Sequence, residues 1–180
     1  MRPPMVLSTE DAGPKACRIG AHVAMAGQES DDGSPRVNRF IEQSANWARA
    51  RAAEETGSYK EFWSFIANSL AENVAVSEMI ARFAARGFAR RDAERLVRTA
   101  VATAIQTSQL EDTIRVEGDG TLRILKCWST GKDEQVCEAC RANEAQGWIG
   151  LNELFRSGHR CPPAHLGCRC ASLFKASGRK

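Results

Sequence analysis

Apolar residues recur at helical spacing from Arg36 to Ile105. The pattern predicts four helices, from 36 to the Gly57-Ser58 pair, over 59–70, near 77–86 and over about 90–108, each with an apolar stripe facing a core. Glycine follows the first and third segments, at Gly57 and Gly87, as is typical of helix ends. The stripes are Phe40, Ser44, Trp47 and Ala48; Tyr59, Phe62, Trp63, Ile66 and Leu70; Met79, Ile80 and Phe83; and Leu96, Val97, Ala100, Val101, Ala104 and Ile105.

The period changes after the fourth predicted helix. Ile114 and Val116 alternate with polar residues, residues 117–120 read Glu-Gly-Asp-Gly, and a second alternating run follows from 122 to 128. Two alternating runs around an Asp-Gly turn predict a β-hairpin. Beyond Trp128 only a short helix around Asn152–Phe155 is expected. The predicted fold class is therefore α+β, with N-terminal helices, a β-hairpin and a small irregular region.

Composition limits the class of protein. The chain has 180 residues, of which 43% are hydrophobic and 26% charged, values ordinary for a globular domain with a tail. No apolar stretch approaches the roughly 20 residues of a membrane span, so no membrane partner is expected. Proline and glycine dominate the start, which predicts a flexible tail over 1–35. A helical region over 36–110, a hairpin and Cys/His-rich region over 111–173 and a basic tail over 174–180 complete the predicted organisation.

The net charge of +3 has an uneven distribution. Residues 121–180 hold ten basic and five acidic side chains, whereas the rest of the chain is nearly balanced. This excess allows a second hypothesis, a zinc-stabilised nucleic-acid-binding module whose basic side chains contact phosphate. A solvated charged surface is the simpler interpretation, because no helix carries a basic stripe. The side chains concerned are Lys126, Lys132, Arg141, Arg156, Arg160, Arg169, Lys175, Arg179 and Lys180.

The seven cysteines are concentrated in the last third of the chain, with Cys17 as the exception. An odd number cannot pair completely within one chain, and the first 25 residues lack the apolar core of a secretory signal. A reducing, cytoplasmic location is therefore expected. Clustered cysteines in such a compartment indicate metal ligands more than disulfides.

Two ligand pairs share one spacing. Cys137 and Cys140 form a C-x-x-C pair, and His165 and Cys168 form an H-x-x-C pair after a gap of 24 residues. Two such pairs joined by a loop can close a tetrahedral Cys₃His zinc site. Cys170 is the alternative to Cys168 as fourth ligand, and both stay open. Cys161 and His159 are interpreted as bystanders.

The predicted zinc is structural rather than catalytic. Four protein ligands leave no position for a reactive water. The chain also lacks the H-E-x-x-H pattern of metalloproteases and the H-x-E element of zinc deaminases. No enzymatic activity and no small-molecule substrate are therefore expected, with structural zinc as the cofactor.

The cysteine-rich end resembles a known family. The run from Trp128 through Asp133 and Val136 to Cys140, then Gly147 and Pro162-Pro163-Ala-His165-Leu-Gly-Cys168-Arg169-Cys170, is similar to the C-terminal signature of phage Mu F-like minor head proteins. The helix carrying Arg98 and Thr99 also resembles the family. The likeness covers roughly 87–173.

The resemblance implies a phage or prophage minor capsid protein that acts in head morphogenesis. Its expected partners are portal or capsid proteins, with packaged DNA as a further candidate, and its expected location is the virion or the host cytoplasm. Cys137, Cys140, His165 and Cys168 or Cys170 would occupy the metal positions. Trp128, Asp133 and Arg169 would be framework residues, and Arg98 and Thr99 would link the helix to the metal region, with Asp133 as a candidate partner for Arg98.

Overall fold

A computed structural model describes residues 35–120 and 122–178. The predicted tail over 1–35 lies almost entirely outside these residues, as do the last two residues of the predicted basic tail. The elements, in chain order, are α1 (Pro35–Glu54), α2 (Gly57–Ala71), α3 (Val76–Ala84), α4 (Arg90–Gly118), β1 (Ile124–Ser129), α5 (Glu138–Ala145), β2 (Ile149–Gly150) and β3 (Ala171–Ala176).

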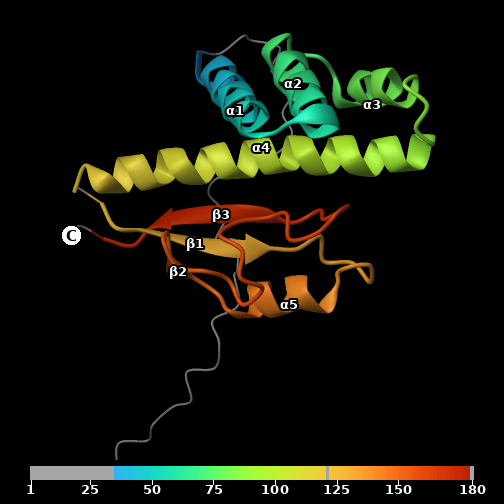
Figure 1. Ribbon diagram of the computed structural model, residues 1–180. Helices are drawn as coiled ribbons and strands as arrows, with labels where there is room; N and C mark the ends of the chain where they lie inside the picture. The colour runs from blue at the N-terminus through green and yellow to red at the C-terminus, as the bar shows by residue number, and fades with distance from the viewer. Residues whose placement is uncertain (1–34, 121, 179–180) are drawn as a thin grey trace, which may run out of the picture.

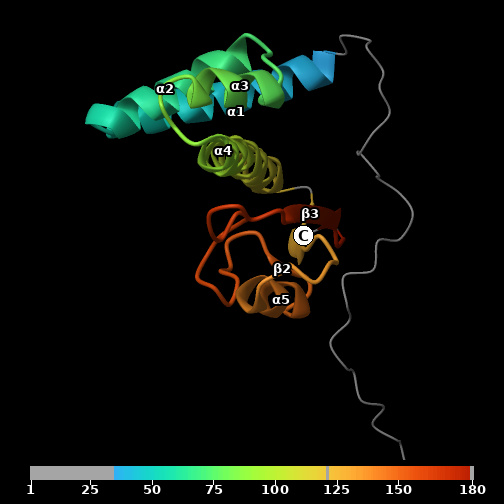
Figure 2. The ribbon, with the colours of Figure 1, turned by 90° about the vertical axis from the view of Figure 1, so that its right-hand side faces the viewer.

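The long helix α4 lies at the centre of a layered molecule (Figure 1). Helices α1, α2 and α3 lie on one side of it, the sheet lies on the other, and α5 lies beyond the sheet (Figures 1 and 2). The main core forms between α4 and the three helices above it, around buried Ile66, Met79, Phe83 and Val97. Among the described side chains, the predicted stripes are confirmed as core-facing except at Tyr59, which is 70% exposed, and Phe40 lies outside the described side chains.

The predicted β-hairpin is wrong. Ile114 and Val116 belong to α4, which continues ten residues past its expected end, and residues 117–120 terminate that helix instead of turning between strands. Leu110 and Ile114 are four residues apart and pack in one small apolar cluster, so helical spacing extends through this region. Gly120 adopts a positive φ of 79° just past the helix end.

The strand expected over 122–128 is confirmed as β1, which begins two residues later at Ile124, but its partners come from far along the chain. The sheet is antiparallel in the order β2-β1-β3, and Lys126 pairs with Ile149 on one side and Phe174 on the other. The helix predicted around Asn152–Phe155 is replaced by turns, and α5 forms earlier, over Glu138–Ala145. The mixed α+β class is confirmed.

Helix α4 also covers the outer edge of β3. The Gln106 Oε1 atom accepts a hydrogen bond from the backbone amide of Ser172 at 2.7 Å, and the Thr107 hydroxyl lies 3.8 Å from the Cys161 sulfur. Covering an edge strand with a helix removes a surface on which other chains could pair. One helix therefore supports both halves of the molecule. None of the described helices combines the length and apolarity required for a membrane span.

Candidate metal centre

The first ligand pair is placed by the start of α5. Cys137 is the N-cap residue of this helix, and its Sγ atom accepts a hydrogen bond from the amide of Cys140 at 3.4 Å. An N-cap acceptor satisfies one of the backbone amides that a helix start leaves unpaired. The same turn brings the Cys140 side chain back beside Cys137, so the C-x-x-C spacing and the helix start create one geometry.

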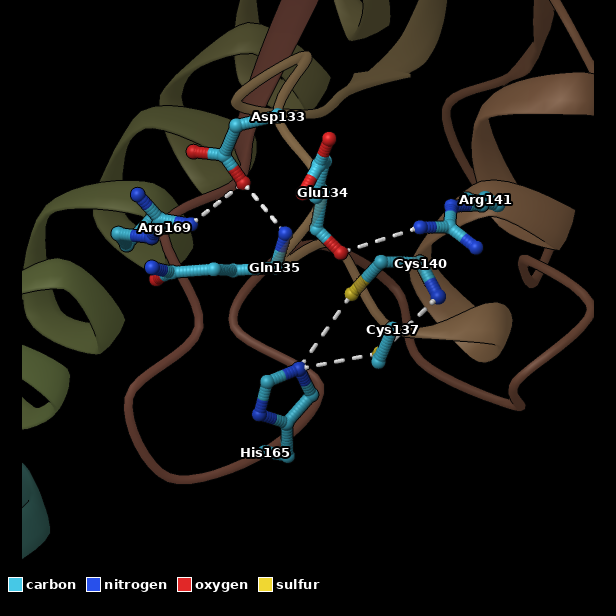
Figure 3. Close-up of polar contacts among 8 residues, drawn as sticks. All are labelled: Asp133, Glu134, Gln135, Cys137, Cys140, Arg141, His165 and Arg169. Atoms are coloured by element: carbon cyan, nitrogen blue, oxygen red, sulfur yellow. Dashed lines mark hydrogen bonds and ion pairs between the residues drawn. The ribbon is translucent and has the colours of Figure 1, made fainter.

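The second pair arrives on the loop that precedes β3. The His165 Nε2 atom lies 3.3 Å from the Cys137 sulfur and 3.5 Å from the Cys140 sulfur (Figure 3). The sulfurs of Cys140 and Cys168 are 3.8 Å apart. The structure therefore brings together all four residues that the two spacings single out.

These distances suit a tetrahedral ion. With Zn–S bonds of about 2.3 Å and Zn–N bonds of about 2.0–2.1 Å, two sulfurs lie about 3.8 Å apart and a sulfur and a nitrogen about 3.6 Å apart. A small cavity of ≈ 20 Å³ is lined by the same cysteines and histidine. Such a volume is sufficient for one small ion, and thiolate with imidazole is a donor set that zinc prefers.

Cys170 lies beside Cys140 and Cys168 in the same cluster. The ligand atoms of Cys137, Cys140 and His165 lie within 4.8 Å of one another, and those of Cys140, Cys168 and Cys170 form a second group of the same kind. Cys140 is common to both groups. Cys168 and Cys170 both lie near Cys140, and they are the two alternatives that the spacing left open for a fourth ligand.

Proton affinities differ strongly among these sulfurs. Hydrogen bonding from Cys170 lowers the pKa of Cys168 to about 5, and burial raises the pKa of Cys140 to about 12. The sulfur of Cys168 beside it raises the pKa of Cys170 far above its ordinary value. The amide of Cys140 lowers the pKa of Cys137, and a hydrogen bond to a backbone carbonyl raises the pKa of His165. Cys140 and Cys170 therefore keep their protons beside the Cys168 thiolate, because neighbouring thiolates repel each other, and a bound dication would stabilise the deprotonated sulfurs.

An ion pair joins the two ligand loops outside the cluster. The Asp133 Oδ1 atom accepts hydrogen bonds from the Gln135 amide at 3.0 Å and from Arg169 Nη2 at 2.8 Å (Figure 3). The Arg169 hydrogen bond lowers the pKa of the Asp133 carboxyl. Arg169 lies between the candidate ligands Cys168 and Cys170, so this contact restrains the second loop against the first. Asp133 and Arg169 thus serve as framework residues, as does buried Trp128.

The expected partnership of Arg98 with Asp133 is wrong. Arg98 is exposed and pairs with Glu94 on its own helix at 2.9 Å. A residue at this position needs no distant carboxylate, because i, i+4 pairing satisfies it at the surface. Thr99 does link α4 to the metal loop: its hydroxyl accepts a hydrogen bond from the Gly167 amide at 2.8 Å.

Two buried anchors were not predicted. The Lys126 side chain is fully buried and donates to the carbonyls of Leu151 at 2.7 Å and Arg160 at 2.8 Å. Asn143 of α5 holds the facing loop, because its amide group donates to the Ser157 hydroxyl and accepts from the Ser157 amide. The sequence held one sign that Lys126 is buried: it occupies an apolar position of the alternating run, between Ile124 and Trp128.

Glu144 anchors the other end of the site. Its carboxylate accepts hydrogen bonds from the Thr130 amide at 3.0 Å and the Thr130 hydroxyl at 2.9 Å, and it pairs with Lys132. Burial opposes ionisation of this carboxyl, but the hydrogen bonds from Lys132 and Thr130 prevail and lower its pKa. The start of the loop between β1 and α5 is therefore tied to α5.

The basic side chains of the C-terminal region are partly engaged within the protein. Lys126 is buried, Lys132 pairs with Glu144, and Arg169 pairs with Asp133. Arg179 and Lys180 lie outside the described residues. The positive excess available to a partner is accordingly smaller than the sequence count indicates.

The fold and site define a helical protein whose small antiparallel sheet carries a Cys/His cluster. A family model described as "Phage Mu protein F like protein" matches residues 60–173. The match spans more than half of the chain, and the chain belongs to this family of phage head morphogenesis proteins. The matched region begins in α2, whereas the resemblance in the sequence was noted only from about residue 87. No curated protein and no solved structure gives a significant match.

Proposed function

We propose that this chain is a minor head protein that acts in capsid assembly near the portal, through contacts with other head proteins. Family membership supports the role in head morphogenesis. The chain also has the construction of a rigid adaptor, since α4 packs against a helical layer on one side and the sheet edge on the other.

A structural zinc ion is the cofactor that we propose for this role. The observation that carries it is the set of ligand distances, 3.3 and 3.5 Å from His165 to the two sulfurs and 3.8 Å between the sulfurs of Cys140 and Cys168. We assign Cys137, Cys140, His165 and Cys168 as the ligands. Zinc bound there would cross-link the start of α5 to the loop before β3, segments that otherwise meet through few apolar side chains.

The zinc content of variants in which one cysteine is replaced by alanine tests this assignment. Native mass spectrometry of the full chain should find one zinc ion per chain, and Cys168→Ala should lose it. Cys161→Ala is the matched control, because Cys161 lies apart from both ligand groups and should keep its zinc. Retention of zinc by Cys168→Ala together with its loss in Cys170→Ala would transfer the fourth position to Cys170.

The proposed partners require a separate experiment. The tagged chain, expressed with the portal and major capsid proteins of its own phage, should be recovered with the portal protein, and cross-linking mass spectrometry should locate the contact. Arg115→Ala, which removes only an exposed i, i+3 pair, is a control for general surface charge. Retention on DNA that falls steeply with added salt, without recovery of any head protein, would instead favour the nucleic-acid-binding hypothesis.

A further inference from the structure

The helical layer carries an open hollow between α2 and α3. Both helices lie on the side of α4 away from the sheet, so α4 separates the hollow from the candidate metal centre (Figures 1 and 2). On α2 the hollow follows a different stripe from that of buried Ile66 and Leu70, which face the core. Its volume is ≈ 820 Å³, and its walls include Lys60, Glu61, Phe65, Glu72, Arg82 and Arg86.

Three side chains of this surface meet around the buried ring of Phe83. Phe65 lies beside that ring with centroids 5.8 Å apart, and Phe88 stacks on it at 4.5 Å with the planes 18° apart. The guanidinium carbon of Arg86 lies 4.7 Å from the centre of the Phe65 ring and 5.9 Å from that of Phe83. A guanidinium is attracted to the face of an aromatic ring, so these rings hold Arg86 in place. We call Phe65, Phe83, Arg86 and Phe88 the aromatic platform.

Arg86 is exposed, and within residues 35–120 and 122–178 it has no ion-pair partner. Arg82, one turn earlier on the same side of the hollow, pairs with Glu78 at 2.9 Å. The planar edge of a guanidinium matches a carboxylate through two parallel hydrogen bonds. Because the rings already restrain Arg86, this side chain has less freedom to lose when it binds such a group.

Phe88 supplies an apolar contact beside this arginine. The residue is 46% exposed, although one side of its ring stacks on Phe83. Arginine and aromatic residues are enriched in protein–protein interfaces relative to the rest of the surface. An exposed ring beside a restrained guanidinium therefore favours contact with another polypeptide.

The charges around the hollow favour a protein partner over a nucleic acid. Lys60, Arg82 and Arg86 line it together with the carboxylates of Glu61 and Glu72. A phosphate backbone that crossed the hollow would approach both carboxylates, and like charges repel. A polypeptide can instead present one acidic side chain to Arg86 and neutral or basic side chains to the two glutamates.

We propose that the aromatic platform binds an acidic segment of another head protein. A carboxylate of that segment pairs with Arg86, and a neighbouring apolar side chain packs on the exposed ring of Phe88. The assignment rests on the proposed role in head assembly, and it adds the surface that makes the contact and the chemistry of the segment that is contacted.

Peptide binding to the full chain tests this assignment. The probe is a set of overlapping peptides that covers the portal and major capsid proteins of the same phage. We expect the bound peptides to contain Asp or Glu beside an apolar residue. In fluorescence anisotropy, Arg86→Gln and Phe88→Ala should each weaken the binding of such a peptide by about tenfold or more, with near-wild-type melting temperatures as the check on folding.

The matched control is Arg90→Gln. It removes the same charge four residues further along the chain, from an exposed side chain that has no ion pair or ring contact among the described residues. Its affinity for the peptide should stay within about twofold of the wild type, because one exposed charge contributes little. Arg86→Lys, which keeps the charge but not the planar guanidinium, should bind more weakly than the wild type.

Four results would overturn the assignment. The first is equal weakening by Arg86→Gln and Arg90→Gln, which would indicate diffuse attraction between charges. The second is wild-type affinity in both Arg86→Gln and Phe88→Ala, which would place the contact elsewhere on the chain. The third is failure of the wild type to bind any peptide. The fourth is arginine-dependent binding of a short single-stranded oligonucleotide without binding of any peptide, which would identify nucleic acid as the occupant.

Recovery of the whole portal protein separates this assignment from the proposed function. If Arg86→Gln and Phe88→Ala recover it as well as the wild type does, the aromatic platform is not the contact surface, although the role in head assembly stands. If the wild type itself recovers no head protein, the proposed function fails together with the assignment. Neither measurement depends on zinc content, since α4 lies between the platform and the candidate metal centre.

Discussion

The hydroxyl of Thr99, in the middle of α4, accepts a hydrogen bond from the backbone amide of Gly167 in the loop between His165 and Cys168. The two residues are 68 positions apart in sequence and 2.8 Å apart in space. The same hydroxyl donates to the Arg95 carbonyl at 2.6 Å, so both of its hydrogen-bonding roles are occupied. Thr99 therefore connects the helical layer directly to the second ligand pair.

Replacing Thr99 with valine should loosen the ligand loop. The change keeps the side-chain shape but removes the acceptor, which is expected to cost about 0.5–1.5 kcal/mol in the free energy of unfolding. Hydrogen exchange should accelerate at Gly167. Thr103→Val is the matched control, because among the described residues the Thr103 hydroxyl bonds within α4, to the Thr99 carbonyl. Equal exchange in the two variants would contradict a special role for Thr99.

Zinc removal should destabilise the C-terminal region selectively. Structural zinc in small modules contributes on the order of 10 kcal/mol or more, and loss of that contribution would release the loops around Cys140 and His165. A strong chelator should lower the melting temperature and increase hydrogen exchange over 130–170, with a smaller effect over the helical core at 60–105. In the Cys161→Ala variant, the chelator should lower the melting temperature as much as in the wild type. A melting temperature insensitive to chelator would argue against a structural ion.

Lys126 should make stability depend on alkaline pH. Burial lowers the pKa of this ammonium from 10.5 to about 8 in the folded protein. Between those values the unfolded chain binds a proton that the folded chain does not, so the free energy of unfolding rises as the pH rises. The full rise amounts to about 3 kcal/mol, since each unit of pKa shift corresponds to about 1.4 kcal/mol.

The matched variant for this test is Lys126→Met, which keeps the stem of the side chain without the charge. The difference in unfolding free energy between wild type and variant should increase between pH 8 and 10.5 and remain constant at lower pH. Subtracting the two chains removes the titration of the cysteines, which is common to both. Denaturant titration across this range measures the difference, and parallel curves would contradict the lowered pKa.

The extension of α4 through Ile114 and Val116 also has a direct test. On a hairpin these residues would share one face, whereas on the helix Ile114 packs beside Leu110 and Val116 is 49% exposed. Ile114→Asp should therefore destabilise the protein by about 1–3 kcal/mol, because it places a carboxylate in a partly buried apolar contact with Leu110. Val116→Asp should change stability by less than about 0.5 kcal/mol. Similar losses in both variants would favour the hairpin.

Local pattern was sufficient for much of this protein. The helical stripes on α2, α3 and α4 define core faces because a period of 3.6 residues needs no knowledge of the partner. The closeness of Cys137 and Cys140, which we propose as ligands, likewise follows from spacing, because C-x-x-C at a helix start folds the fourth residue back beside the first. The resemblance around Trp128 and His165 identified the family correctly.

Tertiary structure decided the rest. The short apolar pattern around Ile114 is compatible with either a helix or a strand. The helix is the structure that lets Ile114 pack in one cluster with Leu110 and Phe174. The partners of β1 are segments far along the chain, which no local period can reveal. Whether Arg98 or Thr99 reaches the metal loop depends on the rotation of α4 against the sheet. That rotation results from contacts on both sides of α4 at once. The sequence alone therefore determined the helices, the strand β1 and the Cys/His pairs, and packing determined which of these segments contact one another.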